Sequence, residues 1–408
     1  MTKSTATPAS TRLAPPKVRR RSAGEGSVYR DGSGWRGAIT WTAPDGTRHR
    51  RVVRAGTSDA ARDKLDDLRR ELRLGTIEPP GRKLTVGAYL ATWIERDRNR
   101  VRPSTWHSSE MHVRCYLMPE LGRLPLARLT SADVERALGT FLAHGRPAGA
   151  GRPRPVSPAT ALHVRATLRR ALSDAQRDGL VGRNAAGDAR PPYSPHRPVS
   201  YLGADDVRRL LEATADDERG PLYALAATTG LRLGELLGLS WQDVNLIAGT
   251  LTVRQSLALA RGGGYTLAEP KSARSRRTIP LPERARAALR RQRERQDAAR
   301  ASMGTAWQDL DGLVFTDTVG RRLLPETISH AFARARVAAG IPRVRFHDLR
   351  HSAATLMLAE GVPLAVISEW LGHAGIAITA AHYAAVVPAL RRDAAAAMDR
   401  ALATGDAR

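Results

Sequence analysis

The sequence predicts a multidomain protein that is mainly α-helical and carries small β-sheets. Its 408 residues exceed what one hydrophobic core usually covers. Apolar residues recur at helical spacing along most of the chain, whereas period-two alternation is confined to short runs near the N-terminus and after residue 250. Two proline-rich linkers, at 79–81 and 189–200, interrupt these patterns. We therefore expect an N-terminal three-stranded sheet with one helix, then a helical domain, then a mixed α+β domain.

The chain is strongly basic, with a net charge of +25, and only five of its 65 cationic residues are lysines. Cationic side chains that displace counterions from phosphates provide most non-specific affinity for nucleic acids, so the charge predicts such a partner. A merely soluble basic surface is the alternative. The single cysteine, Cys115, excludes an internal disulfide and a cysteine-ligated zinc site, and it fits a reducing cytosol. No apolar run approaches the ~20 residues that span a bilayer.

The N-terminal part is expected to comprise a disordered basic tail, 1–23, and a folded module, 24–80. Its strands are predicted at Ser27–Arg30, Trp35–Trp41 and Arg48–Val53. A helix capped by Ser58 follows and ends at Gly75. Such a module could be generic, but an arginine-rich sheet suits a DNA groove. We predict DNA contacts from Arg36, Arg48 and Arg50.

The helical domain is predicted over 84–188, with helices at 85–96, 104–117, 131–144 and 157–178. The last helix has Ser157 as its cap and Pro158 at its first position. One of its sides is apolar, and the other carries Arg165, Arg169 and Arg170. These arginines either contact phosphates or form an ordinary solvated face.

The final unit, 201–408, mixes helices and strands and holds the most unusual chemistry. Helices are expected at 204–215, 221–229 and 283–300, and strands at 250–255 and 277–281. In HDLRH a helix would place His347, Arg350 and His351 on one face. His373 follows Gly372, at which a helix should end, and Tyr383 is the last tyrosine. Imidazoles, a guanidinium and a phenol, brought together, could bind and attack a phosphodiester.

Two further positions bear on this chemistry. Arg232 begins a helix in TTGLRLGELLGL and has Glu235 three residues on, a spacing that is also that of an ordinary ion pair. Lys271 lies in a predicted β-hairpin and is the one lysine after Lys83. A lysine can donate a proton near phosphate, whereas an arginine cannot release one. Chance retention of one lysine is the alternative.

The order TGLRLGEL, hairpin lysine, HDLRH, LGH and downstream tyrosine resembles the signature of the tyrosine recombinases, specifically phage-type and integrative-element integrases. The resemblance covers nearly the whole chain. It implies an arm-type DNA-binding domain at 24–80, a helical core-binding (SAM-like) domain at 84–188, and a catalytic domain with a C-terminal helix at 201–408. It also implies a site-specific recombinase that cleaves and rejoins DNA through a 3′-phosphotyrosyl intermediate, integrating or excising a phage or mobile element.

The resemblance implies a role for each site residue. Arg232 and Arg350 would hold the non-bridging oxygens of the scissile phosphate, and Tyr383 would attack the phosphorus. Lys271 would protonate the departing 5′-hydroxyl, His347 would act as general acid or base, and His373 would donate a hydrogen bond to the phosphate. Glu235 would support the site from behind. No metal, ATP or other cofactor is expected. Tyr383 lies ten residues after His373, one more than in the commonest family motif.

The resemblance further implies double-stranded DNA attachment sites and a homotetramer on two synapsed sites. A helix from Pro388 would dock on a neighbouring protomer or fold back on its own domain. A directionality factor or a host DNA-bending protein is a possible partner, and a bacterial cytoplasmic, nucleoid-associated location is expected. Two rival functions remain open: a DNA-binding regulator with an inactive recombinase fold, and a metal-dependent hydrolase using His347, Asp348, His351 or His373.

Overall fold

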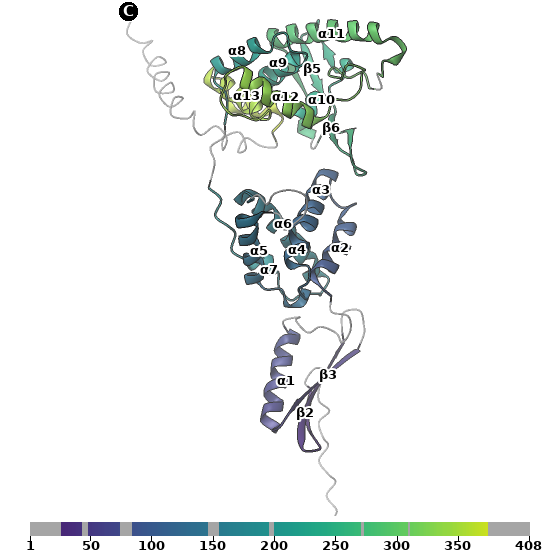
Figure 1. Cartoon of the computed structure of the whole chain (residues 1–408), viewed down its shortest axis with the longest axis vertical. Coiled ribbons are helices and arrows are strands. Elements are labelled where there is room, and N and C mark those ends of the chain that lie inside the picture. Colours follow the sequence, from purple (N-terminus) through teal and green to yellow (C-terminus); the bar gives the residue numbers. More distant parts are fainter. Residues whose placement is uncertain are drawn as a thin grey trace, which may run out of the picture. The chain divides into compact units, whose positions relative to one another are not determined.

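The computed structural model describes residues 26–42, 48–73, 84–145, 155–195, 200–270, 273–308 and 311–373. The chain divides into two compact units, Met1–Ser194 and Pro195–Arg408 (Figure 1). Helices predominate in the described residues and the sheets are small, which confirms the predicted fold class. Within these residues no helix is both long enough and apolar enough to cross a membrane.

The first unit begins with an antiparallel sheet of β1 (Ser27–Asp31), β2 (Gly34–Thr42) and β3 (Arg48–Ala55), in that order. Helix α1 (Ser58–Arg73) lies beside it, and Leu65 and Leu68 pack on Ile39 of β2. The cap of α1 is Thr57 rather than the predicted Ser58, because the Thr57 hydroxyl accepts the Ala60 amide at 3.3 Å.

The three predicted DNA-contacting arginines of this sheet share one face. The strand register pairs Arg50 with Thr40 and Arg48 with Thr42, which alternate with the helix-facing Ile39. Arg36 has the same parity as Thr40 and pairs with Asp31 at the hairpin end. Arg48 and Arg50 are exposed, so the sheet presents a basic face opposite α1.

The helical part of this unit has its own core, in which Trp93, Phe141, Leu168 and Leu172 are almost fully buried. Its elements are α2 (Val86–Asp97), α3 (Pro103–His112), a π-helical turn (Val113–Leu117), α4 (Met118–Leu121), a 3₁₀ turn (Leu126–Arg128), α5 (Ser131–His144), α6 (Pro158–Arg177) and α7 (Ala185–Asp188). The predicted cap holds, since the Ser157 hydroxyl accepts the Thr160 amide.

The predicted helix at 104–117 is wrong in one respect, because a π-helical turn interrupts it. The amide of Met118 donates to the carbonyl of Val113, five residues back. Pro119 follows directly and has no N–H to offer the carbonyl four residues before it. The wider turn therefore accommodates the proline without ending the helical path.

The arginines on α6 differ in their surroundings. Arg165 donates to two main-chain carbonyls at the end of α7, at 3.0 and 2.7 Å. Arg170 donates to the buried carboxylate of Asp97 at 2.6 Å and to Ser109 at 3.0 Å. Arg165 and Arg170 thus have partners within the domain although both are partly exposed, and their contact with phosphate stays a prediction. Arg169 is exposed, and its contact with phosphate stays a prediction.

The second unit combines helices with two small sheets. Its elements are α8 (Ala204–Ala213), α9 (Gly220–Thr229), α10 (Leu233–Leu237), β4 (Val244–Asn245), β5 (Thr250–Val253), β6 (Ser256–Leu259), β7 (Tyr265–Ala268), β8 (Arg277–Pro280), α11 (Glu283–Met303), α12 (Pro325–Ala338), α13 (Asp348–Ala359) and α14 (Leu364–Leu371). Short 3₁₀ turns lie at Trp241–Asp243, Ala273–Ser275 and Gly304–Ala306. Strands β4, β5 and β8 form one antiparallel sheet, and β6 and β7 form a separate hairpin.

Helix α9 is the centre of this unit. Almost every one of its residues is buried, and it packs against α11 and α13. Its Tyr223 ring makes a T-shaped contact with Phe332 of α12 and lies against Phe346, just before α13. Arg232 follows the end of α9 and Arg350 lies on α13, so this core fixes the positions of both predicted site arginines.

Candidate active site

The end of α9 turns the chain toward Arg232. Gly230 adopts a left-handed conformation (φ +66°), which glycine adopts at little cost. Arg232 then caps α10: its main-chain amide donates to Glu235 at 3.0 Å, and its guanidinium donates to the same carboxylate at 2.8 Å. In TGLRLGEL a helix stop is thus followed by a helix start at which both hydrogen bonds run from Arg232 to Glu235, the i, i+3 ion pair that their spacing indicates.

Glu235 is buried, with 4% of its side chain exposed, and it is held by two arginines. Besides Arg232, the guanidinium of Arg277 donates to it at 3.0 Å. Burial alone would raise the pKa of the Glu235 carboxyl, but Arg277 and then Arg232 outweigh that effect and hold the pKa below its usual value. Glu235 is therefore an anion that orients Arg232, consistent with support from behind.

Arg350 lies on the first turn of α13 and is 3% exposed. One of its terminal nitrogens donates to the carbonyl of Gly230 at 2.8 Å, and the other to the carbonyl of Leu371 at 2.6 Å. Main-chain oxygens from two separate helix ends thus orient this guanidinium. Its position relative to Arg232 is fixed through the turn at Gly230.

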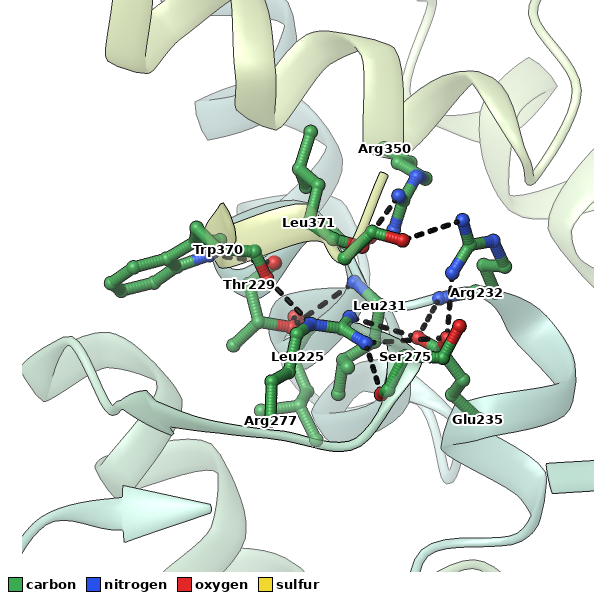
Figure 2. A network of polar contacts seen from close by, with 12 residues as sticks. Leu225, Thr229, Leu231, Arg232, Glu235, Ser275, Arg277, Arg350, Trp370 and Leu371 are labelled. Carbon is green, nitrogen blue, oxygen red and sulfur yellow. Dashed lines mark hydrogen bonds and ion pairs between the residues drawn. The ribbon is translucent and has the colours of Figure 1, made fainter. Parts of the chain in front are cut away.

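The C-terminal end of α14 brings the arginines together (Figure 2). The successive carbonyls of Trp370, Leu371 and Gly372 accept hydrogen bonds from Arg277, Arg350 and Arg232, at 2.6, 2.6 and 3.4 Å. The last carbonyls of a helix lack intrahelical partners and carry its negative dipole end, so they suit cations. Three guanidinium groups from three parts of the chain thus converge on one helix end.

His373 follows this helix end directly. Gly372 is left-handed (φ +66°) and ends α14, as the sequence predicts, and the amide of His373 donates to the carbonyl of Ser368 at 2.9 Å. A cavity of about 730 Å³ lies between β8 and α14 and is lined by Arg277, Trp370 and His373, among others. His373 thus lines an open cavity together with Arg277, one of the arginines that bind the end of α14.

His347 caps α13, one turn before His351, and the two rings meet edge to face with centroids 5.4 Å apart. The pKa of His347 is lowered by desolvation of its ring and then by the charge of Arg350, with a smaller effect of Arg232. The imidazole is therefore within the field of both arginines and favours its neutral form. The edge-to-face contact shows that the His351 ring packs against His347.

The described residues thus bring together Arg232, Glu235, Arg350 and His373, with His347 nearby. Lys271 and Tyr383, and hence the spacing from His373 to Tyr383, lie outside the described residues. Sequence reasoning missed Arg277. A signal was present, because in strand β8 Arg277 has the same parity as the buried Ile279. Within the part of the chain that the structure describes, no three His, Cys, Asp or Glu side chains are grouped to hold a metal ion.

Comparisons with known proteins agree with this arrangement. Residues 200–389 match the phage integrase family, and residues 85–140 match the phage integrase N-terminal SAM-like domain. An integrase of Saccharopolyspora erythraea is 26% identical over 93% of this chain and 97% of its own length. The tyrosine recombinase XerD of Mycobacterium tuberculosis is 31% identical over 70% of this chain and 87% of its own.

Solved structures share the fold. The Tn1549 transposon integrase, solved in complex with transposon right end DNA, has a TM-score of 0.62 at 21% identity, over 74% of this chain and 95% of that one. A lambda integrase tetramer bound to a Holliday junction has a TM-score of 0.53 at 20% identity, over 88% of this chain and 94% of that one. The chain therefore belongs to the phage integrase family and is a tyrosine-type site-specific DNA recombinase.

Proposed function

We propose that this recombinase cleaves DNA with Tyr383 as nucleophile at a phosphate held by Arg232 and Arg350. The observation that carries the proposal is the convergence of both guanidinium groups on the end of α14, next to His373. Arg232 is oriented by a buried carboxylate yet has 37% of its side chain exposed, so part of its guanidinium faces solvent, where a phosphate can approach. Guanidinium pairs bind phosphate oxygens in fixed geometry.

The chemistry assigns the remaining residues. The Tyr383 oxygen bonds to phosphorus as the bond to the 5′-oxygen breaks, which leaves a 3′-phosphotyrosine and a 5′-hydroxyl. The two arginines stabilise the charge that develops on the non-bridging oxygens. Lys271 supplies the proton to the departing oxygen, His373 donates a hydrogen bond to the phosphate, and neutral His347 accepts the phenol proton. The covalent link conserves the energy of the broken bond, so rejoining needs no ATP.

The substrate is double-stranded DNA with attachment sites of a phage or other mobile element. The basic face of the N-terminal sheet, with Arg36, Arg48 and Arg50, supports a role for 24–80 as an arm-type DNA-binding domain. We assign 1–23 to a basic tail, 189–200 to a linker and 201–408 to the catalytic domain. We assign 84–188 to a core-binding domain in which Arg165, Arg169 and Arg170 contact phosphate.

The assembly we propose is a homotetramer on two synapsed sites, in the manner of the lambda integrase tetramer on a Holliday junction. The segment from Pro388 would dock on a neighbouring protomer. A directionality factor or a host DNA-bending protein would set the direction of the reaction, and the enzyme would act on DNA in the bacterial cytoplasm.

A nicked suicide substrate tests the nucleophile, because loss of a short fragment traps the covalent adduct. We expect the wild type to form a protein–DNA adduct on its own attachment site and Tyr383→Phe to form none. An adduct with Tyr383→Phe, or none with the wild type, would refute the assignment. Specific binding without any adduct would instead favour an inactive DNA-binding regulator.

The sheet is tested by DNA affinity as a function of salt. We expect Arg48→Ala and Arg50→Ala each to reduce the slope of log K against log salt by about 0.9 for each lost phosphate contact. Arg70→Ala is the matched control, since Arg70 is 69% exposed on α1 and pairs with Asp67. Equal slopes for all three variants would show that the N-terminal sheet does not contact DNA phosphates.

A further inference from the structure

Arg277 lies where three functional segments of the second unit meet. It starts β8, follows the segment that contains Lys271, and reaches both α10 and α14. Its side chain is 6% exposed, whereas that of Arg232 is 37% exposed. All three guanidinium nitrogens of Arg277 donate to protein oxygens, which indicates a supporting role rather than a phosphate ligand like Arg232.

The contacts of Arg277 use its whole guanidinium group. Its Nε donates to the carbonyl of Trp370 at 2.6 Å, and Nη1 donates to the carbonyl of Ser275 at 3.0 Å. Nη2 donates to Glu235 at 3.0 Å (Figure 2). A side chain at position 372 would approach Nη1 to 3.0 Å, so Gly372 is needed where the chain passes this group. Main-chain oxygens on two sides thus fix the fork that faces Glu235.

Glu235 passes this constraint to Arg232. Its carboxylate accepts from both guanidinium groups, and it is 4% exposed, so without Arg277 it would be a buried anion with one partly exposed partner. Without Arg277, the carboxylate would keep only the bonds from the amide and guanidinium of Arg232, three residues before it, so no bond from another segment would fix the orientation of the pair. Transition-state stabilisation requires the donor to be fixed before the charge develops.

We propose that Arg277 is a positioning residue for DNA cleavage, which holds Glu235 and through it Arg232 in the geometry that receives the scissile phosphate. This inference rests on the proposed role of Arg232. It assigns to Arg277 no contact with DNA. Loss of the Arg277 guanidinium should slow the chemical step and leave DNA binding unchanged. The size of this effect should depend on the Glu235 carboxylate, through which Arg277 acts.

The test is single-turnover cleavage of the suicide substrate at saturating protein. Wild type and Tyr383→Phe run alongside, so that a failure of the proposed function is recognised separately. We expect Arg277→Met to lower the cleavage rate constant about 100-fold, with the Kd for DNA within about threefold of the wild type. Arg276→Met is the matched control, because the neighbouring Arg276 is 57% exposed and pairs with Glu269 at the surface. It should cleave within about threefold of the wild-type rate.

Two comparisons separate positioning from a general structural role. In a Glu235→Gln background, Arg277→Met should slow cleavage by less than about threefold, because no carboxylate remains to be held. With a neutral methylphosphonate at the scissile position, the deficits of Arg277→Met and Arg232→Ala should both shrink at least about tenfold, because less charge needs stabilising. If Arg277→Met does not fold, Arg277→Lys, which keeps the charge but not the fork, undergoes the same comparisons. An unchanged rate, an equal deficit in both backgrounds, or an equal deficit on the neutral substrate overturns the proposal.

Discussion

Replacing Gly230 with alanine should destabilise the second unit through two separable effects. The left-handed backbone costs an L-residue about 1–2 kcal/mol. A Cβ would also lie 2.6 Å from Cδ2 of Leu371, which is fully buried and has nowhere to move without displacing its neighbours. Overpacking of this kind costs about 1–3 kcal/mol, so the total is about 2–5 kcal/mol.

Gly340 provides the matched control. It is also left-handed (φ +62°) and follows the end of α12, but a Cβ there would meet nothing within 4 Å. Gly340→Ala should therefore show the backbone cost alone, about 1–2 kcal/mol. The difference between the two variants isolates the contact with Leu371.

Hydrogen exchange measured by mass spectrometry on the full chain reports this difference locally. Amides of α9 and α14 should exchange about 5- to 150-fold faster in Gly230→Ala than in Gly340→Ala, which corresponds to about 1–3 kcal/mol. Because the carbonyl of Leu371 orients Arg350, Gly230→Ala should also cleave DNA more slowly than the control. Equal protection of α9 and α14 in both variants would refute the reasoning.

Three further predictions concern buried charges. Glu235→Gln should destabilise the chain by about 3–5 kcal/mol in urea unfolding, since it leaves a buried guanidinium without its counter-charge. The folded protein lowers the pKa of Glu235, so the ionised carboxylate stabilises the fold at pH values above the usual pKa of 4.5. This stabilisation is lost as the pH falls below 4.5, and Glu235→Gln should not show that loss. Burial lowers the pKa of His112 from 6.5, so the stability that the neutral ring provides above pH 6.5 declines on acidification; pulse proteolysis should show less acid sensitivity in His112→Gln. Arg170→Ala should destabilise by about 3–5 kcal/mol by leaving buried Asp97 unpaired, whereas Arg169→Ala should stay within about 0.5 kcal/mol and instead weaken DNA binding.

Local signals in the sequence predicted the helix ends of the site well. Gly372 ends a helix as predicted, because glycine adopts a left-handed turn at little cost, and Arg232 begins a helix with Glu235 as its ion-pair partner, as their spacing indicates. These features depend on neighbours within four residues. The spacing of apolar residues and the helix-end residues therefore locate these features to the correct helical turn before any tertiary contact is known.

Contacts between segments that are distant in the chain could not be predicted from the sequence in the same way. The sequence predicted a β-hairpin containing Lys271 but not the bounds of its strands β6 and β7. It also gave no sign that α10 packs against this hairpin, where a Cβ on Gly234 would lie 2.7 Å from the carbonyl of Leu257. Arg277 and Glu235 are 42 residues apart, and nothing in their spacing indicates that they pair. Helical periodicity likewise could not indicate the partners that Arg165 and Arg170 find on other helices.

The end of α14 also links folding of the catalytic unit to its ligand. Three guanidinium charges gathered at one helix terminus repel one another, and the single charge of Glu235 and the carbonyl dipoles offset that repulsion only in part. An anion that binds among them removes the remaining repulsion, and it binds the folded state alone. Occupancy by a phosphate should therefore stabilise α14 by mass action, so the enzyme becomes most rigid at the place and moment at which it holds DNA.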